Sequence, residues 1–477
     1  MYSTAMLRAA NTILSLVVLA LLTSSCGSSS ALDSQLSGRT LVYSPGVPNF
    51  DLEAIATLRG DQSGIDLYIG LPKASLIFLK RGDEYVARYE VSIELRDEDD
   101  KYTLDDLTWS DTVRVADYEE TQQYDQMIIQ RRFNTEEGRY IVDATITDNN
   151  SEQIAERRLR LEVFSRETTG FALSRIRVEA REGAEPFKPI VSYHLPSSLD
   201  SLRSVVELYN VPPGEKVLVE MSLVSFPSDT SVANPPYWLT PNIGSLTYQG
   251  VDFSKPDTVQ VTRRVLGDVQ EDVTIEFTFP SLTHGTYRMT IEARSEDAPP
   301  EEAEILKRQR NLSIKSEDFP HVSTLNQLID ALSYIAYERE LKEIRAGATV
   351  EERRARFDAF WGKLVNNREA ARNLIKQYYG RVEEANLFFT GQKEGWKTDR
   401  GMVYIILGAP VFVEYSYDMQ IWHYSYSDRD ALNSFDFRRV RPFGNTADFE
   451  NYILLRRPFY ERAWTRAIER WRSGSML

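Results

Sequence analysis

The stretch 85-YVARYEVSIEL-95 decides the fold of the first third of the chain, because apolar and polar residues alternate strictly from Ala87 onward. Alternation with a period of two predicts a strand with one face buried and the other in water. The same pattern returns at 140–147 and 158–163, and acidic turn clusters separate these stretches. We therefore predict a β-sandwich domain over residues 38–167.

A second β-rich region is predicted over residues 168–317. Its strands share the same alternation and lie at 174–180, 216–223, 273–279 and 285–293. Short strands with regular turns favour an immunoglobulin-like or fibronectin-type sandwich. The segments GRYIVDATITD and GTYRMTIEARSED resemble each other, and duplication of one module is one interpretation of the two sandwiches.

After Pro320 the periodicity changes to that of helices. Thr324 with Gln327 and Thr349 with Glu352 have the spacing of capping boxes at helix N-termini. Apolar residues at helical spacing follow each of them, and a third helix is predicted from about 368 to 389.

Strands are predicted after these helices, and a helix with Trp464 and Trp471 on its apolar face closes the chain. The predicted strands lie at 402–407, 411–416, 420–426 and 452–455. Helices followed by a small antiparallel sheet indicate an α+β domain over residues 318–477. The predicted fold class is therefore multidomain, with two all-β sandwiches followed by an α+β domain.

The N-terminus has the pattern of a signal peptide over residues 1–25. Arg8 precedes an apolar run at 13–22, and small polar residues lead to Cys26. The run is too short to span a bilayer, which needs about 20 apolar residues. Cys26 is the only cysteine of the chain, so it has no partner for an internal disulfide.

The position of Cys26 resembles the bacterial lipobox, in which that cysteine carries the lipid anchor. One departure is Thr23, which stands where the lipobox usually has leucine. The resemblance implies lipidation at Cys26, residues 26–37 as a lipidated tether, and an outer-membrane location on its periplasmic or surface face. The alternative is an ordinary cleaved signal peptide with a chance cysteine nearby.

The charge of the chain argues against nucleic acid as a partner. There are 56 lysines and arginines against 71 aspartates and glutamates, which gives a net charge of −15. An acidic chain repels phosphate backbones. The four histidines have no metal-ligand spacing, and no phosphate loop or serine elbow is present, so we expect no cofactor, no metal and no catalytic residue.

The segment Gly395-Trp396-Lys397-Thr398-Asp399 contains several residue types that favour tight turns and close packing. Gly395 and Gly401 suit a positive φ or a close backbone approach. Thr398 and Asp399 can bond nearby backbone amides and close a tight turn, which Trp396 would clamp onto the helices. This structural interpretation competes with a functional one, in which Trp396 and Asp399 form a recognition pocket.

That segment and its surroundings resemble the GWxTD domain of bacterial secreted proteins and lipoproteins. The likeness covers about residues 318–477 and rests on YYGRVEEANLFF before the motif, RGMVYIILGAP after it and IWHY beyond. The resemblance implies a secreted or lipid-anchored protein and no particular activity. Within the same region Trp422, Tyr424 and Tyr426 alternate on one face of a predicted strand, either as an aromatic binding strip or as one side of a core.

Two functions remain open from the sequence. The first is a non-catalytic interaction or scaffold protein of the cell envelope, attached to the membrane through Cys26 and bound to an envelope protein partner. The second is an envelope hydrolase that uses carboxylates of the C-terminal domain, because paired carboxylates leave no sequence spacing to find. We favour the first, and expect that the protein is not an enzyme.

Overall fold

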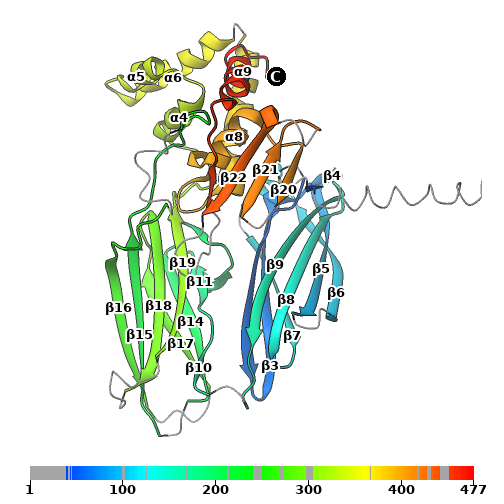
Figure 1. The fold of residues 1–477 in the computed structure, drawn as a ribbon, viewed down its shortest axis with the longest axis vertical. Helices are drawn as coiled ribbons and strands as arrows, with labels where there is room; N and C mark the ends of the chain where they lie inside the picture. The colour runs from blue at the N-terminus through cyan, green and yellow to red at the C-terminus, as the bar shows by residue number, and fades with distance from the viewer. Residues whose placement is uncertain are drawn as a thin grey trace, which may run out of the picture.

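The computed structural model contains three parts, two sandwiches side by side and a mixed domain above them (Figure 1). The described residues are 39–476, apart from 41–42, 44–45, 99–101, 125, 168–169, 212–213, 240–249, 268–271, 297–304, 366, 416–417, 427–430 and 441–450. The predicted fold class is confirmed. Among the described residues, no helix is both long and apolar enough to cross a membrane.

The first sandwich packs a three-stranded sheet against a five-stranded sheet. The three-stranded sheet has the order β2 (Asp51–Arg59), β3 (Gln62–Pro72), β7 (Gln126–Asn134). The other has the order β4 (Leu79–Arg81), β5 (Glu84–Asp97), β8 (Gly138–Asp148), β9 (Gln153–Val163), with β6 (Thr103–Val115) also paired to β5. The alternation that predicted β5 places Val91, Ile93 and Leu95 in the core between the sheets.

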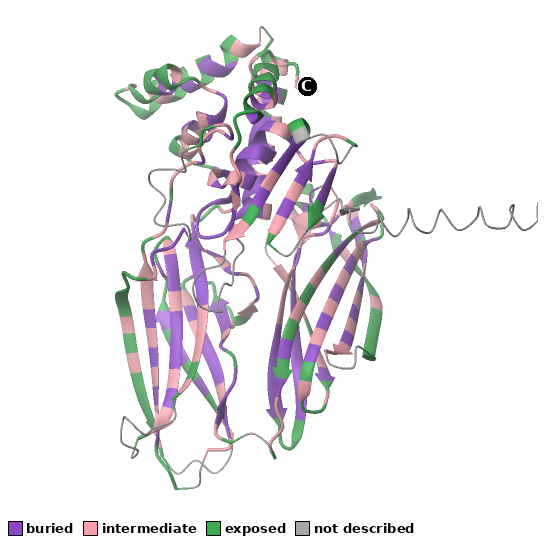
Figure 2. Ribbon diagram, viewed as in Figure 1, coloured by how far each residue is buried: buried purple, intermediate pink, exposed green. Residues whose placement is uncertain are grey.

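The second sandwich has two five-stranded sheets around its own core (Figure 2). One sheet contains β10 (Ala172–Leu173), β14 (Ser201–Tyr209), β11 (Arg177–Arg181) and β12 (Lys188–Ile190), with β17 (Val273–Pro280) paired to β14. The other has the order β13 (His194–Pro196), β19 (Leu306–Lys315), β18 (Gly285–Ser295), β15 (Val217–Phe226), β16 (Asp257–Leu266). Its only parallel pair among the described strands is β13 with β19.

The C-terminal domain combines helices with a small antiparallel sheet, as its sequence pattern predicted. The helices are α4 (Leu325–Ala331), α5 (Glu338–Arg345), α6 (Val350–Leu364), α7 (Arg368–Phe389), α8 (Asp399–Leu407) and α9 (Tyr460–Arg472). The sheet has the order β1 (Arg39–Thr40), β20 (Phe412–Tyr415), β21 (Met419–His423), β22 (Ser434–Val440), β23 (Asn451–Leu454). Strand β1 comes from the start of the described chain, so a segment that precedes the first sandwich completes the sheet of the C-terminal domain.

One element of this domain was predicted wrongly. Residues 402–407 were expected to form a strand, but they belong to helix α8. Met402–Ile406 are buried all round, and a short apolar run that is buried on every side has no polar face to reveal its period. Strand β22 was missed, because the sequence prediction placed no element between 426 and 452.

Candidate functional site

The motif Gly395–Asp399 lies between α7 and α8, where it forms a short 3-10 helix (Gly395–Lys397) and the start of α8. Thr398 is the N-cap of α8: its Oγ1 accepts a hydrogen bond from the Gly401 amide at 3.0 Å. The same hydroxyl donates to the Gly395 carbonyl at 2.7 Å. Thr398 thereby joins the two short helices into one turn, as threonine caps commonly do.

The two glycines of the motif serve close packing. A Cβ on Gly395 would lie 1.9 Å from the Ala385 carbonyl oxygen, and a Cβ on Gly401 would lie 1.9 Å from the Gly395 carbonyl oxygen. Neither residue has a positive φ. Of the two roles predicted for these glycines, a positive φ or a close backbone approach, the structure shows the close backbone approach.

Trp396 is fixed in the core and is only 2% exposed. Its amide donates to the Asn386 Oδ1 at 3.1 Å, and its carbonyl accepts a hydrogen bond from the Tyr334 hydroxyl at 2.7 Å. The rings of Tyr334 and Trp396 meet edge to face, with centroids 6.4 Å apart. A side chain enclosed in this way contributes packing and has no surface to offer a ligand.

Asp399 forms a buried ion pair with Arg456, which follows β23. Its Oδ1 lies 2.6 Å from Arg456 Nη2 and its Oδ2 lies 3.0 Å from Nη1. The amide of Leu454 donates to Oδ2 at 2.7 Å, and both charged side chains are only 10% exposed. The sequence interpretation placed the bonds of Asp399 within the local turn, whereas the structure places them 55 residues further along the chain.

A segment of the second sandwich packs directly on the motif. The Ala233 amide donates to the Lys397 carbonyl at 3.1 Å, and Arg456 Nη2 donates to the Asn234 carbonyl at 3.3 Å. Ala233 belongs to the hydrophobic core of the C-terminal domain. We call residues 229–238 the docking segment.

An ion pair holds the start of the docking segment. Lys393 Nζ lies 2.8 Å from Asp229 Oδ2 and donates to the Ser231 carbonyl at 2.8 Å. Burial alone would raise the pKa of Asp229, but Lys393 and the Ser231 hydroxyl lower it overall. The carboxylate is therefore held in its charged form where the two parts of the molecule meet.

A second polar cluster lies beside the motif. Glu394 contacts Lys397 at 2.8 Å and His284 of the second sandwich at 3.1 Å. Fully buried Lys315, at the end of β19, donates to the Gly391 carbonyl at 3.0 Å. Burial lowers the pKa of Lys315 to about 8.

Comparison with known proteins identifies the family of the C-terminal part of the chain. Residues 301–473 match the family model of the GWxTD domain. The C-terminal part of the chain is a GWxTD domain. The matched range includes β19, so the family pattern extends into the last strand of the second sandwich.

Searches for wider similarity give distant matches. No curated protein matches the chain in sequence. The chain is similar to red sea bream transglutaminase at 9% identity and a TM-score of 0.16, over 56% of this chain and 31% of that protein. It is similar to trypsin-activated alpha-2-macroglobulin from Escherichia coli at 10% identity and a TM-score of 0.17, over 57% and 16%. The chain thus spans less than a third of either structure.

Trp422 and Tyr424 take part in the core of the GWxTD domain. Trp422 is fully buried, with its ring 5.1 Å from Tyr43 and 5.3 Å from Phe389. Tyr424 follows β21 and its hydroxyl donates to the Gly408 carbonyl at 2.8 Å. Trp422 and Tyr424 therefore follow the core alternative, whereas Tyr426 is 90% exposed, so the three do not form one aromatic strip.

The remaining predicted site, Cys26, lies outside the described residues. Among the residues that are described, no group of three histidine, aspartate, glutamate or cysteine side chains could hold a metal ion. The carboxylates at the GWxTD motif, Asp399 and Glu394, are each paired with cations. This arrangement of ion pairs and hydrogen bonds joins the second sandwich to the C-terminal domain.

Several residues of the site were missed by sequence reasoning. Asn386 and Tyr334 bond to Trp396 from 10 and 62 residues away, and Lys393 bonds to Asp229 of the docking segment across 164 residues. No local pattern marks such partners, because only the tertiary fold brings them together. Arg456 alone carried a signal, since it follows a predicted strand in an arginine-rich stretch.

Proposed function

We propose that the chain is a secreted lipoprotein of the bacterial cell envelope, attached to a membrane, most simply the outer membrane, through a lipid on Cys26. The support is in the sequence: the apolar run at 13–22, the small residues after it and a single cysteine directly behind them. The polar, small residues 27–30 suit a flexible tether between the anchor and the first sandwich.

We further propose that the protein acts as a non-catalytic interaction or scaffold protein. The observation that carries this is the state of the GWxTD motif, whose threonine hydroxyl, aspartate carboxylate and tryptophan backbone all bond inside the molecule. Asp399 is paired with Arg456, and Trp396 is buried. The Lys397 carbonyl accepts a hydrogen bond from the Ala233 amide of the docking segment. The motif then works as an internal clamp that presents two sandwiches to an envelope protein partner.

Mild crosslinking in cells that produce the full chain tests this role. The chain is then purified and its crosslinked partners are identified by mass spectrometry, with a Cys26→Ser variant as the control for membrane attachment. We expect one envelope protein to copurify in stoichiometric amount with the wild type. Absence of any enriched protein would count against an interaction role.

The alternative, an envelope hydrolase, predicts turnover by the purified protein. Its carboxylates would have to act from the C-terminal domain, where Asp399 is the acid of the motif and its side chain is 10% exposed. The decisive case is an activity on envelope glycans or peptides that Asp399→Asn abolishes at a temperature where circular dichroism shows the variant still folded. Such a result would replace the scaffold proposal.

A further inference from the structure

A large cleft lies between the two sandwiches, below the sheet of the GWxTD domain. Its volume is about 2380 Å³, and its walls come from all three parts of the chain. The first sandwich contributes β2 and β9, the second contributes 172–176, β12, β13 and β19, and the GWxTD domain contributes Phe388 and Arg400. Pockets for small molecules are usually about 300–1,000 Å³, so this cleft suits a longer ligand.

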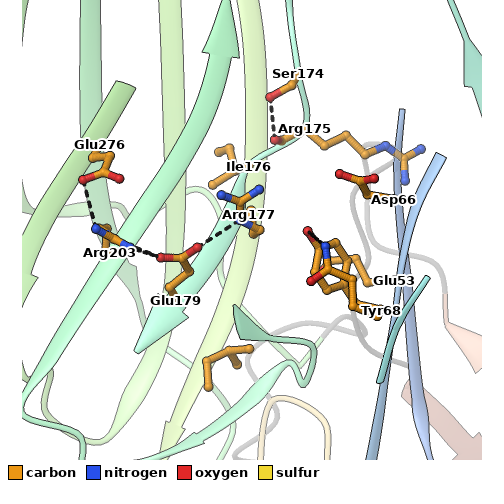
Figure 3. A network of polar contacts seen from close by, with 12 residues as sticks. Glu53, Asp66, Tyr68, Ser174, Arg175, Ile176, Arg177, Glu179, Arg203 and Glu276 are labelled. Carbon is orange, nitrogen blue, oxygen red and sulfur yellow. Dashed lines mark hydrogen bonds and ion pairs between the residues drawn. The ribbon is translucent and has the colours of Figure 1, made fainter. Parts of the chain in front are cut away.

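Side chains that link the two sandwiches hold the cleft in shape. Arg310 of β19 pairs with Glu53 of β2 and donates to the carbonyls of Ile176 and Ile190 at 3.0 and 2.9 Å. Figure 3 shows Glu53 and Tyr68 of the first sandwich facing Arg177 of the second, which is paired with Glu179 at 3.0 Å. The cleft is therefore preformed by contacts within the chain.

Two arginines of the cleft wall have no such counter-charge. Arg308 of β19 donates only to the neighbouring Lys307 carbonyl, at 3.1 Å, and no described carboxylate pairs with it or with Arg175. Strand β19 runs beside the segment that contains Arg175, because Arg310 bonds to Ile176. Burial and the positive charge of Arg175 lower the pKa of Arg308, so the two guanidinium groups are close enough to repel.

The charge of the cleft is opposite to that of the whole chain. Among its lining residues, lysine and arginine outnumber aspartate and glutamate by ten to eight, whereas the chain has 56 against 71. An anion that joins these two adjacent cations gains charge-assisted hydrogen bonds from both guanidinium groups. This pattern selects ligands that carry oxyanions.

The cleft also offers unpaired strand edges. Strands β2 and β9 end their sheets, so one edge of each pairs with no other strand in the described part of the chain. All six residues of β9 from Ile154 to Leu159 line the cleft. A free edge provides backbone donors and acceptors for an added strand, which favours a polypeptide over other anionic ligands.

We propose that this cleft binds an extended acidic polypeptide segment, with Arg175 and Arg308 contacting its carboxylates. The inference rests on the proposed interaction role and names the chemistry of the partner. Two guanidinium groups hold carboxylates in fixed geometry, and a backbone laid along β9 places successive side chains on alternate sides. An acidic segment can thus be recognised without a defined pocket for each residue.

Binding of a fluorescein-labelled octaglutamate peptide to the full-length protein tests the proposal by fluorescence anisotropy. The key variant is Arg175→Ala with Arg308→Ala, and the matched control is Arg354→Ala with Arg372→Ala, two exposed helical arginines that do not line the cleft. We expect the key variant to bind at least about tenfold more weakly, because it loses the charged hydrogen bonds from both guanidinium groups to the peptide carboxylates. The control should bind like wild type.

Three results would overturn the proposal: no binding by wild type, equal losses in both variants, or tighter arginine-dependent binding of labelled polygalacturonate than of peptide. The last would assign the cleft to an acidic glycan. The crosslinking experiment separates this inference from the proposed function. A copurifying partner that the Arg175→Ala, Arg308→Ala variant retains would leave the interaction role standing and remove the cleft from it.

Discussion

At the residue scale, the GWxTD motif consists of positions where a single atom matters. Gly401 lies so close to the Gly395 carbonyl that a methyl group has no space, because the obstructing atom belongs to the backbone and cannot rotate away. Interiors packed at this density transmit such a clash into the surrounding elements. The residues of the motif are therefore required for close backbone contacts as much as for side-chain chemistry.

Replacing Gly401 by alanine should lower the free energy of unfolding by roughly 3 kcal/mol or more, because the turn before α8 must open. The matched control is Gly380→Ala in α7, where an added Cβ meets no atom within 4 Å. Alanine in a helix interior is favoured over glycine by about 0.5–1 kcal/mol, so this variant should be slightly more stable. Urea unfolding of both variants measures the difference, and similar losses in both would contradict the packing account.

Buried Lys315 predicts a pH effect of known sign. The folded protein releases this proton near pH 8, whereas the unfolded chain holds it to the ordinary value of 10.5. Between these values the unfolded state binds more protons, so the contribution of Lys315 to stability rises with pH, by up to about 3 kcal/mol. Below pH 8 both states carry the proton and this contribution is constant.

The Lys315→Met variant should lack that rise. Chemical unfolding of wild type and variant at intervals from pH 7 to 10.5 gives the two curves, and their difference isolates this lysine from the other groups that titrate in the range. Parallel curves would show that Lys315 is not held in a desolvated site.

At the scale of elements, the ends of helices were easier to predict than the type of short apolar segments. Helix α7 was predicted at about 368–389 and is found at Arg368–Phe389, because its apolar spacing continues over many turns. Segment 402–407 has no such spacing, and the Thr398 cap that starts α8 was interpreted only as part of a turn. A threonine directly before an apolar run was the signal available for a helix.

The Asp399–Arg456 pair connects α8 to the segment after β23. Removing one partner leaves a buried charge unpaired, so Asp399→Ala should cost about 3–5 kcal/mol of unfolding free energy. The double variant Asp399→Ala, Arg456→Met should cost less than the two single changes together, because neither charge then remains. Chemical unfolding of all four proteins measures the coupling, and strictly additive losses would mean that the pair does not act as a unit.

At the scale of the whole molecule, the sequence predicted the kind of each part but not how the parts meet. The alternating strands and the helical periods define two sandwiches and an α+β domain. The contacts between them, such as Lys393 with Asp229 and Arg310 with Glu53, join residues 164 and 257 positions apart. Pairings of that range leave no trace in local pattern, and neither does the cleft that they enclose.

The proposed anchor makes a separate prediction. Cells that produce the wild-type chain and are supplied with a labelled fatty acid should incorporate the label into it, and the chain should sediment with membranes. The Cys26→Ser variant should lose both properties, because one acylated cysteine is the only anchor proposed. Wild-type protein without label, or a Cys26→Ser variant that stays with the membrane, would contradict lipidation.

The central claim is that the GWxTD motif, together with Lys393 just before it, clamps the second sandwich onto the C-terminal domain, and hydrogen exchange of the Lys393→Met variant tests it most directly. Loss of the Lys393–Asp229 pair should speed amide exchange in residues 229–238 and around 390–402, while the strands of both sandwiches stay protected. The matched control is Lys376→Met, an exposed lysine of α7, which should exchange like wild type. Unchanged exchange in 229–238 of the Lys393→Met variant would show that the motif does not hold the docking segment, and would contradict the account.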